Sequence, residues 1–245
     1  MLLKGKNILV TGGSRGLGRS LCTTFAREGA QVAFNYSTDE KGASETREEA
    51  GTFGPEIRAV KASVIDIDGI RKMVSRIEKD WGRIDVLVNN AGISQMLPMA
   101  LLEEEDWDAV MNINVKGTYL VARMVLRGMI RVRSGKILNI GSLAGMRLIE
   151  SPVHYAASKA AIKGFTESLE KEVARYGITV NSIAPGILEG GVGSSLPSYR
   201  LEDYLDHCAV GRVGKFSEVS EVAAFIVSDE NSYMNGVTLV MDGGL

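Results

Sequence analysis

The 245-residue chain contains only two cysteines, two histidines and five prolines, and the first two shortages already narrow its chemistry. Cys22 and Cys208 lie far apart and form no CxxC pair. Cys22 falls on an apolar helical stripe, which predicts a small core residue without redox or metal chemistry. His154 and His207 are too few for a histidine-rich site, so we expect no metal.

A surplus of one charge and a long apolar run are also missing. The chain has 28 Lys and Arg against 30 Asp and Glu, a formal net charge of -2. This balance predicts no nucleic-acid partner and no binding to an acidic membrane surface. No apolar run approaches the roughly 18 residues of a membrane helix. The opening MLLKGKNILV lacks the long apolar region of a signal peptide, so we expect a cytoplasmic protein.

The chain does contain a regular alternation of short apolar runs and longer helical patterns. Runs such as ILV, VLV and ILNI are nearly all apolar, as in strands covered on both faces. Alternating strands and helices predict βαβ units and one α/β domain over 1–245, a doubly wound parallel sheet of about seven strands with helices on both faces. Strands are expected at 7–11, 31–36, 57–61, 84–88, 136–140, 179–183 and 238–241. Helices are expected at 15–28, 39–51, 66–80, 103–131, 155–175 and 217–228.

The segment at about 187–215 departs from this regularity. It is rich in Gly and Ser, contains Pro197 and includes the amphipathic piece YRLEDYLDHC. A long, Gly-hinged segment inside a compact domain is often a lid or a binding loop. We therefore expect a substrate lid here, in preference to a surface excursion without function.

The stretch ILVTGGSRGLG runs from an apolar strand into a glycine-rich turn and then into a helix. Gly12, Gly16 and Gly18 have the spacing G-x-x-x-G-x-G, and glycine lets backbone turn tightly and approach a ligand closely. The free N–H groups at the start of the helix provide a site for a pyrophosphate. The standard G-x-G-x-x-G fingerprint is absent, so the turn alone fits either a nucleotide site or a tight connection.

The end of the second strand bears on the choice of dinucleotide. An NAD site usually carries a carboxylate about 20 residues after the glycine turn, whereas VAFNYS ends in Tyr36 and Ser37. Arg15 in the glycine turn can hold a 2′-phosphate, which favours NADP(H). Asp39 and Glu40 keep NAD(H) as an alternative, unless they serve only as acids at a helix start.

The alanine-rich stretch HYAASKAAIKG predicts a helix that places Tyr155 and Lys159 one turn apart on one face. A nearby ammonium favours tyrosinate and lowers a phenol pKa that is ordinarily about 10. Such a phenol suits protonation of a carbonyl that accepts a hydride from a nicotinamide. Ser142 ends a buried strand, where its hydroxyl can hydrogen-bond the substrate oxygen. Taken alone, Tyr155 and Lys159 could also be an exposed surface pair without function, and Ser142 could simply be a turn residue at the end of a strand.

Six motifs in their order and spacing resemble the short-chain dehydrogenase/reductases over essentially the whole chain: TGGSRGLG at 11–18, NNAG at 89–92, Asn114 in NINVKG, Ser142 in NIGS, YAASK at 155–159 and NSIAPG at 181–186. Within this family the chain most resembles the 3-oxoacyl-[acyl-carrier-protein] reductases. The resemblance implies a Rossmann fold, an NAD(P)-dependent oxidoreductase acting on CH–OH donors, and a homotetramer. The expected interfaces are the helices at 103–131 and 155–175 and the C-terminal strand.

The resemblance also assigns roles to residues. Asn114 would hold a water in a proton relay from Lys159, which would also bind the nicotinamide ribose. The implied catalytic set is Asn114, Ser142, Tyr155 and Lys159. The expected cofactor set is Gly12, Ser14, Arg15, Gly16, Leu17, Gly18, Tyr36, Ser37, Ser63, Val64, Asn90, Ala91, Gly92, Tyr155, Lys159, Pro185, Gly186 and Leu188. The expected substrate set is Ser142, Met146, Leu148 and Tyr155.

Two positions depart from the family pattern. Ser63 stands where the family often has an acid or Asn that binds adenine, although a hydroxyl can still accept a hydrogen bond. Gly190 stands where the family commonly has a Thr after the Pro-Gly pair. Ser194 and Ser195 are candidates to replace that hydroxyl.

The bulky stretch LAGMRLIESPVH before Tyr155 suits an acyl chain, a polyketide or a ring better than a sugar. The leading prediction is NADP(H)-dependent reduction of a ketone, a 3-oxoacyl thioester or a related ketoacyl or polyketide substrate, to a secondary alcohol, with Tyr155 as the acid. Arg127, Arg131, Arg133 and Lys136 are candidates for docking an acyl carrier protein, although a charge run is more often a solvated helix end.

Three alternatives remain. One is an NAD-dependent dehydrogenase of a cyclic alcohol, a steroid or a sugar. The second is a non-catalytic dinucleotide-binding sensor or scaffold, which would have no use for a tuned phenol. The third is a Rossmann-type methyltransferase, which would not need Y-x-x-x-K.

Overall fold

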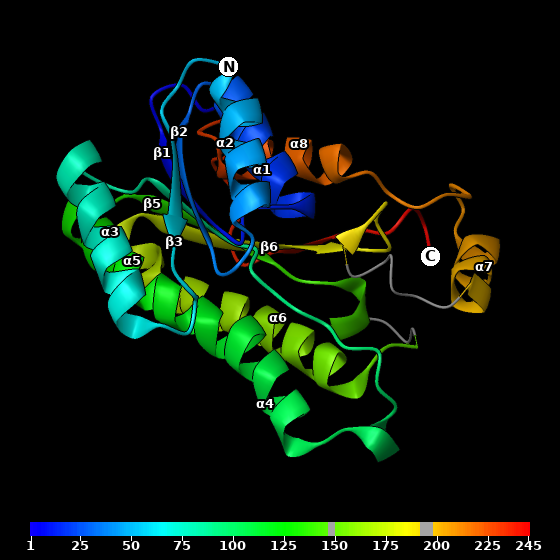
Figure 1. Ribbon diagram of the computed structural model, residues 1–245. Coiled ribbons are helices and arrows are strands. Elements are labelled where there is room, and N and C mark those ends of the chain that lie inside the picture. The colour runs from blue at the N-terminus through cyan, green and yellow to red at the C-terminus, as the bar shows by residue number, and fades with distance from the viewer. Residues whose placement is uncertain (147–149, 192–197) are drawn as a thin grey trace.

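Seven parallel strands form one sheet in the computed structural model, which describes residues 1–146, 150–191 and 198–245 (Figure 1). The strands lie in the order β3-β2-β1-β4-β5-β6-β7, and every neighbouring pair is parallel. This confirms the predicted doubly wound sheet. The strands are β1 Asn7–Thr11, β2 Gln31–Tyr36, β3 Ile57–Lys61, β4 Val86–Asn89, β5 Gly135–Ile140, β6 Ile178–Pro185 and β7 Thr238–Met241.

Helices cover both faces of the sheet, with α1, α2 and α8 on one face and α3, α5 and α6 on the other (Figure 1). The α-helices are α1 Gly16–Arg27, α2 Glu40–Gly51, α3 Ile67–Trp81, α4 Glu104–Met111, α5 Gly117–Val132, α6 Val153–Val173, α7 Ser198–His207 and α8 Phe216–Val227. Shorter turns are η1 Met99–Leu101, the π-helical η2 Asn112–Lys116, η3 Leu143–Gly145 and η4 Ala174–Tyr176.

The apolar strands fold this way because each strand faces a helical layer on both sides. In β1, Ile8 and Val10 join the core under α1, α2 and α8, whereas Leu9 between them joins the core on the other face. Cys22 is fully buried in the first of these cores, which confirms its predicted place.

The expected helix over 103–131 differs from the structure. It is continuous in direction, but a π-helical turn at Asn112–Lys116 separates α4 from α5. Such bulges are frequent at functional sites. Here the turn carries Asn114, which is buried.

Part of the expected lid lies outside the described residues, namely 192–197 with Ser194 and Ser195. Leu148 of the expected substrate set lies outside them as well. The amphipathic piece of the lid is described and forms α7.

The strand order reverses at β1, because β2 and β3 lie on one side of it and β4 to β7 on the other. In open α/β sheets, ligands bind at the carboxyl ends of the strands where the order reverses. The glycine turn follows β1 at this edge, and the NNAG motif spans the end of β4 beside it.

A buried chain of side-chain hydrogen bonds connects α6 to the centre of the sheet. Asn89 Nδ2 in β4 donates to Asn139 Oδ1 in β5 at 2.9 Å, and Asn139 Nδ2 donates to Thr166 Oγ1 in α6 at 2.9 Å. The Thr166 hydroxyl then donates to Ile162 O at 2.8 Å. Because α6 carries Tyr155 and Lys159, this chain fixes the helix that presents both residues.

We expect Thr166→Val to lower the free energy of unfolding by about 1–3 kcal/mol, since it leaves the buried Asn139 amide without its acceptor. Thr166→Ser keeps the hydroxyl and should cost clearly less. Chemical denaturation of both variants measures the difference. Equal losses in the two variants would mean that the Thr166 methyl, which only the serine variant removes, contributes as much as the hydroxyl, and would contradict a dominant role of the hydrogen bond.

Candidate active site

At three positions of the glycine turn after β1, the backbone angle or the lack of space disfavours a side chain. Gly12 and Gly16 have φ of +69° and +56°, a region that side chains rarely adopt. A Cβ on Gly18 would lie 2.0 Å from Gly12 O, so the turn and α1 meet where only hydrogen fits. No side chain caps the start of α1 at Arg15, which leaves the first-turn N–H groups facing the turn. Ser14 and Leu17 complete this segment.

Polar residues at the ends of apolar strands hold the turn in place. Gly12 N donates to Asn35 Oδ1 at 3.2 Å, and Asn35 Nδ2 donates to Ala62 O at 2.7 Å. Thr11 Oγ1 accepts from the backbone N of Asn90 and of Ala91 at 2.9 and 3.0 Å. Sequence reasoning missed Thr11 and Asn35. Their signal was a polar residue at or near the end of an apolar strand.

The NNAG motif packs directly against the turn. Asn90 Nδ2 donates to Thr11 O at 2.9 Å and to Gly12 O at 3.1 Å. A Cβ on Gly12 would lie 3.0 Å from the Cα of Ala91. The structure therefore brings the expected residues Asn90 and Ala91 together with the glycine turn.

The two acids after β2 are both engaged. Asp39 caps α2 by accepting from Gly42 N at 2.9 Å, and Glu40 pairs with Lys61 at 2.5 Å. The Lys61 ammonium lowers the pKa of Glu40. The side chain of Arg15, by contrast, is exposed and makes no hydrogen bond or ion pair with any residue that the structure describes. Tyr36, half-buried, and Ser37, exposed, lie at the end of β2.

The remaining expected cofactor residues follow the ends of β3 and β6. Ser63 is half-buried and its hydroxyl accepts from Ile65 N at 3.4 Å, a local turn bond. Val64 packs so closely on α5 that a Cβ on Gly117 would lie 2.6 Å from it. Pro185 ends β6, and Gly186 and Leu188 follow, Leu188 forming a bridge with Gly214.

Asn114 clamps the backbone after NNAG with both ends of its amide. Its Oδ1 accepts from Ile93 N at 2.8 Å, and its Nδ2 donates to Ile93 O at 3.0 Å and to Ser158 Oγ at 2.9 Å. A Cβ on Gly92 would lie 3.3 Å from Asn114 Oδ1 and 3.6 Å from Lys159 Nζ, so Asn114 and Lys159 flank Gly92. Ser158, within YAASK, is a further member that sequence reasoning missed.

Lys159 carries its ammonium into a buried position. Nζ donates to Ile140 O at 2.8 Å and lies 5.7 Å from the centre of the Tyr155 ring. Burial lowers the pKa of Lys159 to about 8. The group therefore titrates far closer to neutrality than an exposed lysine does.

The pKa of Tyr155 moves in the direction opposite to the one expected. Burial raises it, and a hydrogen bond with Ser142 offsets part of the increase. The cause is that the hydroxyl is shielded from water while the ammonium is directed at Ile140 O. Ser142, at the end of β5, also accepts from Ala144 N at 3.2 Å. The Tyr155 phenol in this arrangement is protonated at neutral pH.

A sequence profile of the short chain dehydrogenase family matches residues 6–199. The chain belongs to the short-chain dehydrogenase/reductase family. It is similar to a 3-oxoacyl-[acyl-carrier-protein] reductase FabG of Thermotoga maritima, 40% identical over 245 residues that make up 100% of this chain and 99% of the relative.

Two solved structures bear on the cofactor. A short chain dehydrogenase from Burkholderia cenocepacia J2315 in complex with NADP is 32% identical, with a TM-score of 0.92, covering 100% of this chain and 99% of that one. An NAD+-bound xylitol dehydrogenase is 30% identical, with a TM-score of 0.93, covering 100% of both. This short-chain dehydrogenase/reductase is thus an NAD(P)-dependent oxidoreductase, and both cofactors occur among its neighbours.

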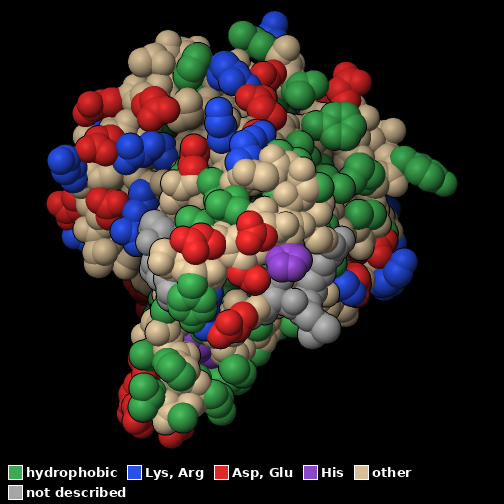
Figure 2. Space-filling model, turned by 90° about the vertical axis from the view of Figure 1, so that its right-hand side faces the viewer, with side chains coloured by type: hydrophobic (Ala, Val, Ile, Leu, Met, Phe, Trp, Pro, Cys, Tyr) green, Lys and Arg blue, Asp and Glu red, His purple; other side chains and the backbone are tan. Residues whose placement is uncertain are grey.

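The carboxyl edge of the sheet has apolar side chains around it. Figure 2 looks onto this edge and shows hydrophobic side chains gathered on a lobe below it, with acidic ones interspersed. Met99, Leu101 and Val153 are among the exposed apolar residues of the segments beside this edge. Met146, from the expected substrate set, is half-buried just after η3.

Hydrogen bonds of Tyr204 and an ion pair of Arg200 attach α7 to the rest of the enzyme. The Tyr204 hydroxyl donates to Asp242 O at 2.9 Å and accepts from Ile187 N at 3.3 Å. Arg200 forms an ion pair with Glu150, which lies just before α6. The described part of the expected lid therefore contacts both the residue that follows β7 and the segment that leads to Tyr155.

The expected basic cluster is split by the fold. Arg127 and Arg131 are exposed on α5, whereas Lys136 is half-buried and donates to Asn231 O at 2.8 Å. Burial lowers the pKa of Lys136. Arg133 donates to Arg175 O at 2.6 Å. Lys136 is therefore a structural lysine and does not belong to a docking surface with the other three.

Over 1–146, 150–191 and 198–245, no helix is both long and apolar enough to cross a membrane. Within the same ranges, no group of three or more His, Cys, Asp or Glu side chains could hold a metal ion.

We expect Lys159→Met to raise the free energy of unfolding relative to wild type at pH 7.5, and the gain to shrink by about 2 kcal/mol at pH 9.5. The folded pKa, about 8, lies below the unfolded value of 10.5, so the unfolded chain binds more protons between them. Wild-type stability therefore rises with pH across this window and the variant lacks that rise. Denaturation at both pH values measures the gain, with Lys163→Met, exposed on the same helix, as control. A gain that does not vary with pH would contradict the burial of a charged Lys159.

Proposed function

We propose that the chain reduces a 3-oxoacyl thioester, or a closely related ketone, to a secondary alcohol with NADPH. The observation that carries the proposal is the convergence of Asn114, Ser142, Tyr155 and Lys159 at the carboxyl edge of the sheet, beside the glycine turn. The 3-oxoacyl-[acyl-carrier-protein] reductase relative supports the substrate class. The apolar side chains around the edge suit an acyl chain better than a sugar.

The residues present fit a dinucleotide, and the charged groups favour NADP(H). The backbone-only space at Gly12 and Gly18 and the uncapped start of α1 suit a pyrophosphate. Arg15 is free of ion pairs with the described residues and can meet a 2′-phosphate. Asp39 and Glu40, the acids that would favour NAD, are engaged in a helix cap and an ion pair.

Tyr155 and Lys159 would lie beside a bound nicotinamide, whose chemistry would be the supply of a hydride for the carbonyl carbon. Tyr155, protonated at neutral pH, would give its proton to the carbonyl oxygen, and Ser142 would hydrogen-bond the same oxygen as negative charge develops on it. Lys159, whose pKa of about 8 lies near neutrality, would stabilise the resulting tyrosinate and return a proton to it. Asn114 holds the Ile93 backbone and Ser158 around Lys159, which suits a relay to solvent.

Three further assignments belong to this proposal. The segment at about 187–215 would act as a substrate lid, anchored through Tyr204 and α7. Arg127, Arg131 and Arg133 would offer cations to an acyl carrier protein. The chain would assemble as a homotetramer in the cytoplasm.

The assay that tests the proposal follows nicotinamide absorbance while the protein is mixed with NADPH, or separately NADH, and a short 3-oxoacyl thioester. We expect rapid oxidation of NADPH and much slower oxidation of NADH. Consumption of NADH alone would favour the alternative of an NAD-dependent dehydrogenase. If both cofactors bind and neither is consumed, the 3-oxoacyl substrate class is wrong.

We expect Tyr155→Phe to reduce turnover by about 10²–10⁴-fold, since it removes the proton donor and little else. NADPH binding, followed by fluorescence titration, should stay within about twofold of wild type. Tyr176→Phe, on η4, is the matched control and should retain full turnover. Unchanged turnover in the Tyr155 variant would remove this residue from the mechanism.

A further inference from the structure

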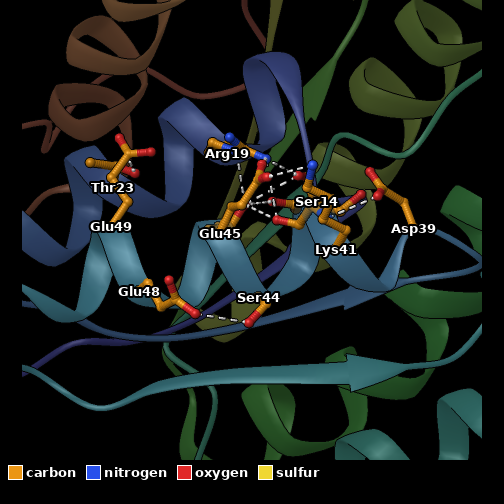
Figure 3. Close-up of polar contacts among 12 residues, drawn as sticks. Ser14, Arg19, Thr23, Asp39, Lys41, Ser44, Glu45, Glu48 and Glu49 are labelled. Atoms are coloured by element: carbon orange, nitrogen blue, oxygen red, sulfur yellow. Dashed lines mark hydrogen bonds and ion pairs between the residues drawn. The ribbon is translucent and has the colours of Figure 1, made fainter.

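Two walls flank the place where an adenosine ribose would lie. One is the glycine turn with Arg15, and the other is the connection from β2 to α2 with Ser37. Gly12, Gly13 and Gly16 have no side chains with which the first wall could contact the second. What fixes their separation is a set of hydrogen bonds between α1, α2 and the turn (Figure 3).

Thr46 of α2 lies at the centre of this set and is fully buried. Its Oγ1 is 3.0 Å from Gly13 O, 3.2 Å from Ser14 O and 2.9 Å from Gly42 O. The first two carbonyls belong to the turn and the third to the first turn of α2. One hydroxyl therefore joins the two walls directly.

Arg19 of α1 completes the connection. Its Nε donates to Thr46 Oγ1 at 3.1 Å, and its Nη2 donates to Ser14 O at 2.9 Å and to Glu45 Oε2 at 2.8 Å. Figure 3 shows Arg19, Ser14 and Glu45 converging between the two helices. The guanidinium thereby holds the carbonyl that directly precedes Arg15.

The backbone of α2 also rests on the turn. A Cβ on Gly42 would lie 2.7 Å from Ser14 O and 2.4 Å from Asp39 Oδ2. The Gly42 amide in turn donates to Asp39 Oδ1 at 2.9 Å. The start of α2, and with it the connection that carries Ser37, is therefore in direct contact with the backbone that carries Arg15.

We propose that Arg19 and Thr46 are positioning residues for cofactor selection: they set the distance between Arg15 and Ser37 and so favour a 2′-phosphate over a 2′-hydroxyl. The reason is that a phosphate must meet Arg15 and the opposite wall at once, whereas a hydroxyl is small and tolerates a wider gap. This inference rests on the proposed preference for NADP(H). Neither residue would touch the cofactor itself.

The chain offers a matched control for a purely structural role. Thr23 Oγ1 of α1 donates to Glu49 Oε1 of α2 at 3.2 Å, which joins the same two helices further from the turn (Figure 3). Loss of this bond should loosen the helix pair without moving Arg15. Thr23→Val therefore separates helix packing from positioning.

The test measures binding of NADPH and of NADH by isothermal titration calorimetry to wild type, Thr46→Val, Arg19→Met and Thr23→Val. We expect the Kd of NADPH to rise about tenfold in the first two variants and the Kd of NADH to change by about twofold or less. Thr46→Ser should restore wild-type values, and Thr23→Val should change neither Kd. Unfolding midpoints without cofactor are recorded for each variant. Arg19→Met changes a partly exposed side chain, so this variant can test the proposal even if Thr46→Val does not fold.

Each possible result of the titrations supports or overturns a specific part of the proposal. A wild type that binds NADH more tightly overturns the proposed cofactor preference, and this inference with it. A wild type that prefers NADPH, with an unchanged NADPH/NADH ratio in Arg19→Met and Thr46→Val, overturns the positioning role alone. Equal weakening of both cofactors, or the same shift in Thr23→Val, would assign these residues to helix packing.

Discussion

The buried ammonium of Lys159 is the constraint on which the rest of the site depends. A charge in a low-dielectric position is unfavourable unless fixed partners surround it. The Ile140 carbonyl supplies one partner at the end of β5. For that carbonyl and α6 to stay in register, the hydrogen bonds from Asn89 through Asn139 to Thr166 must hold the helix to the sheet.

The same requirement explains the π-helical turn between α4 and α5. A regular helix would direct Asn114 elsewhere, and its amide would not reach both the Ile93 backbone and Ser158. With the turn in place, Asn114 bonds both the segment after β4, at Ile93, and α6, at Ser158, the residue before Lys159. Uncharged amides and hydroxyls around the Lys159 ammonium thus both stabilise this region and fix the position of the lysine.

Much of this arrangement follows from sequence, because the residues concerned stand at strand ends or one helical turn apart. The glycine turn, Ser142 at the end of β5 and the Tyr155–Lys159 pair are of this kind, and the sheet brings them to one edge. The direction of the Tyr155 pKa could not be predicted, since it depends on tertiary burial that spacing does not reveal. The π turn could not be predicted either, because NINVK has no residue that distinguishes it from ordinary helix.

Partners, rather than residue types, decide how the acids after β2 should be interpreted. From sequence, Asp39 and Glu40 leave NAD open, and only the fold engages them with Gly42 and Lys61. The fold also changes the interpretation of the expected basic cluster. Lys136 looks like part of a basic surface run, yet it is half-buried against Asn231 O.

Buried polar contacts hold both halves of the proposed site. The dinucleotide side is fixed by buried contacts, among them Thr46, Asn35 and the backbone contact at Gly18. On the other side of the proposed site, the buried Tyr204 anchors α7 through hydrogen bonds with Asp242 O and Ile187 N. The Arg200–Glu150 ion pair adds an exposed contact, a kind that contributes little in water. Both sides of the proposed site therefore depend on buried polar side chains that bond backbone carbonyls, and the exposed ion pair is the weakest of these contacts.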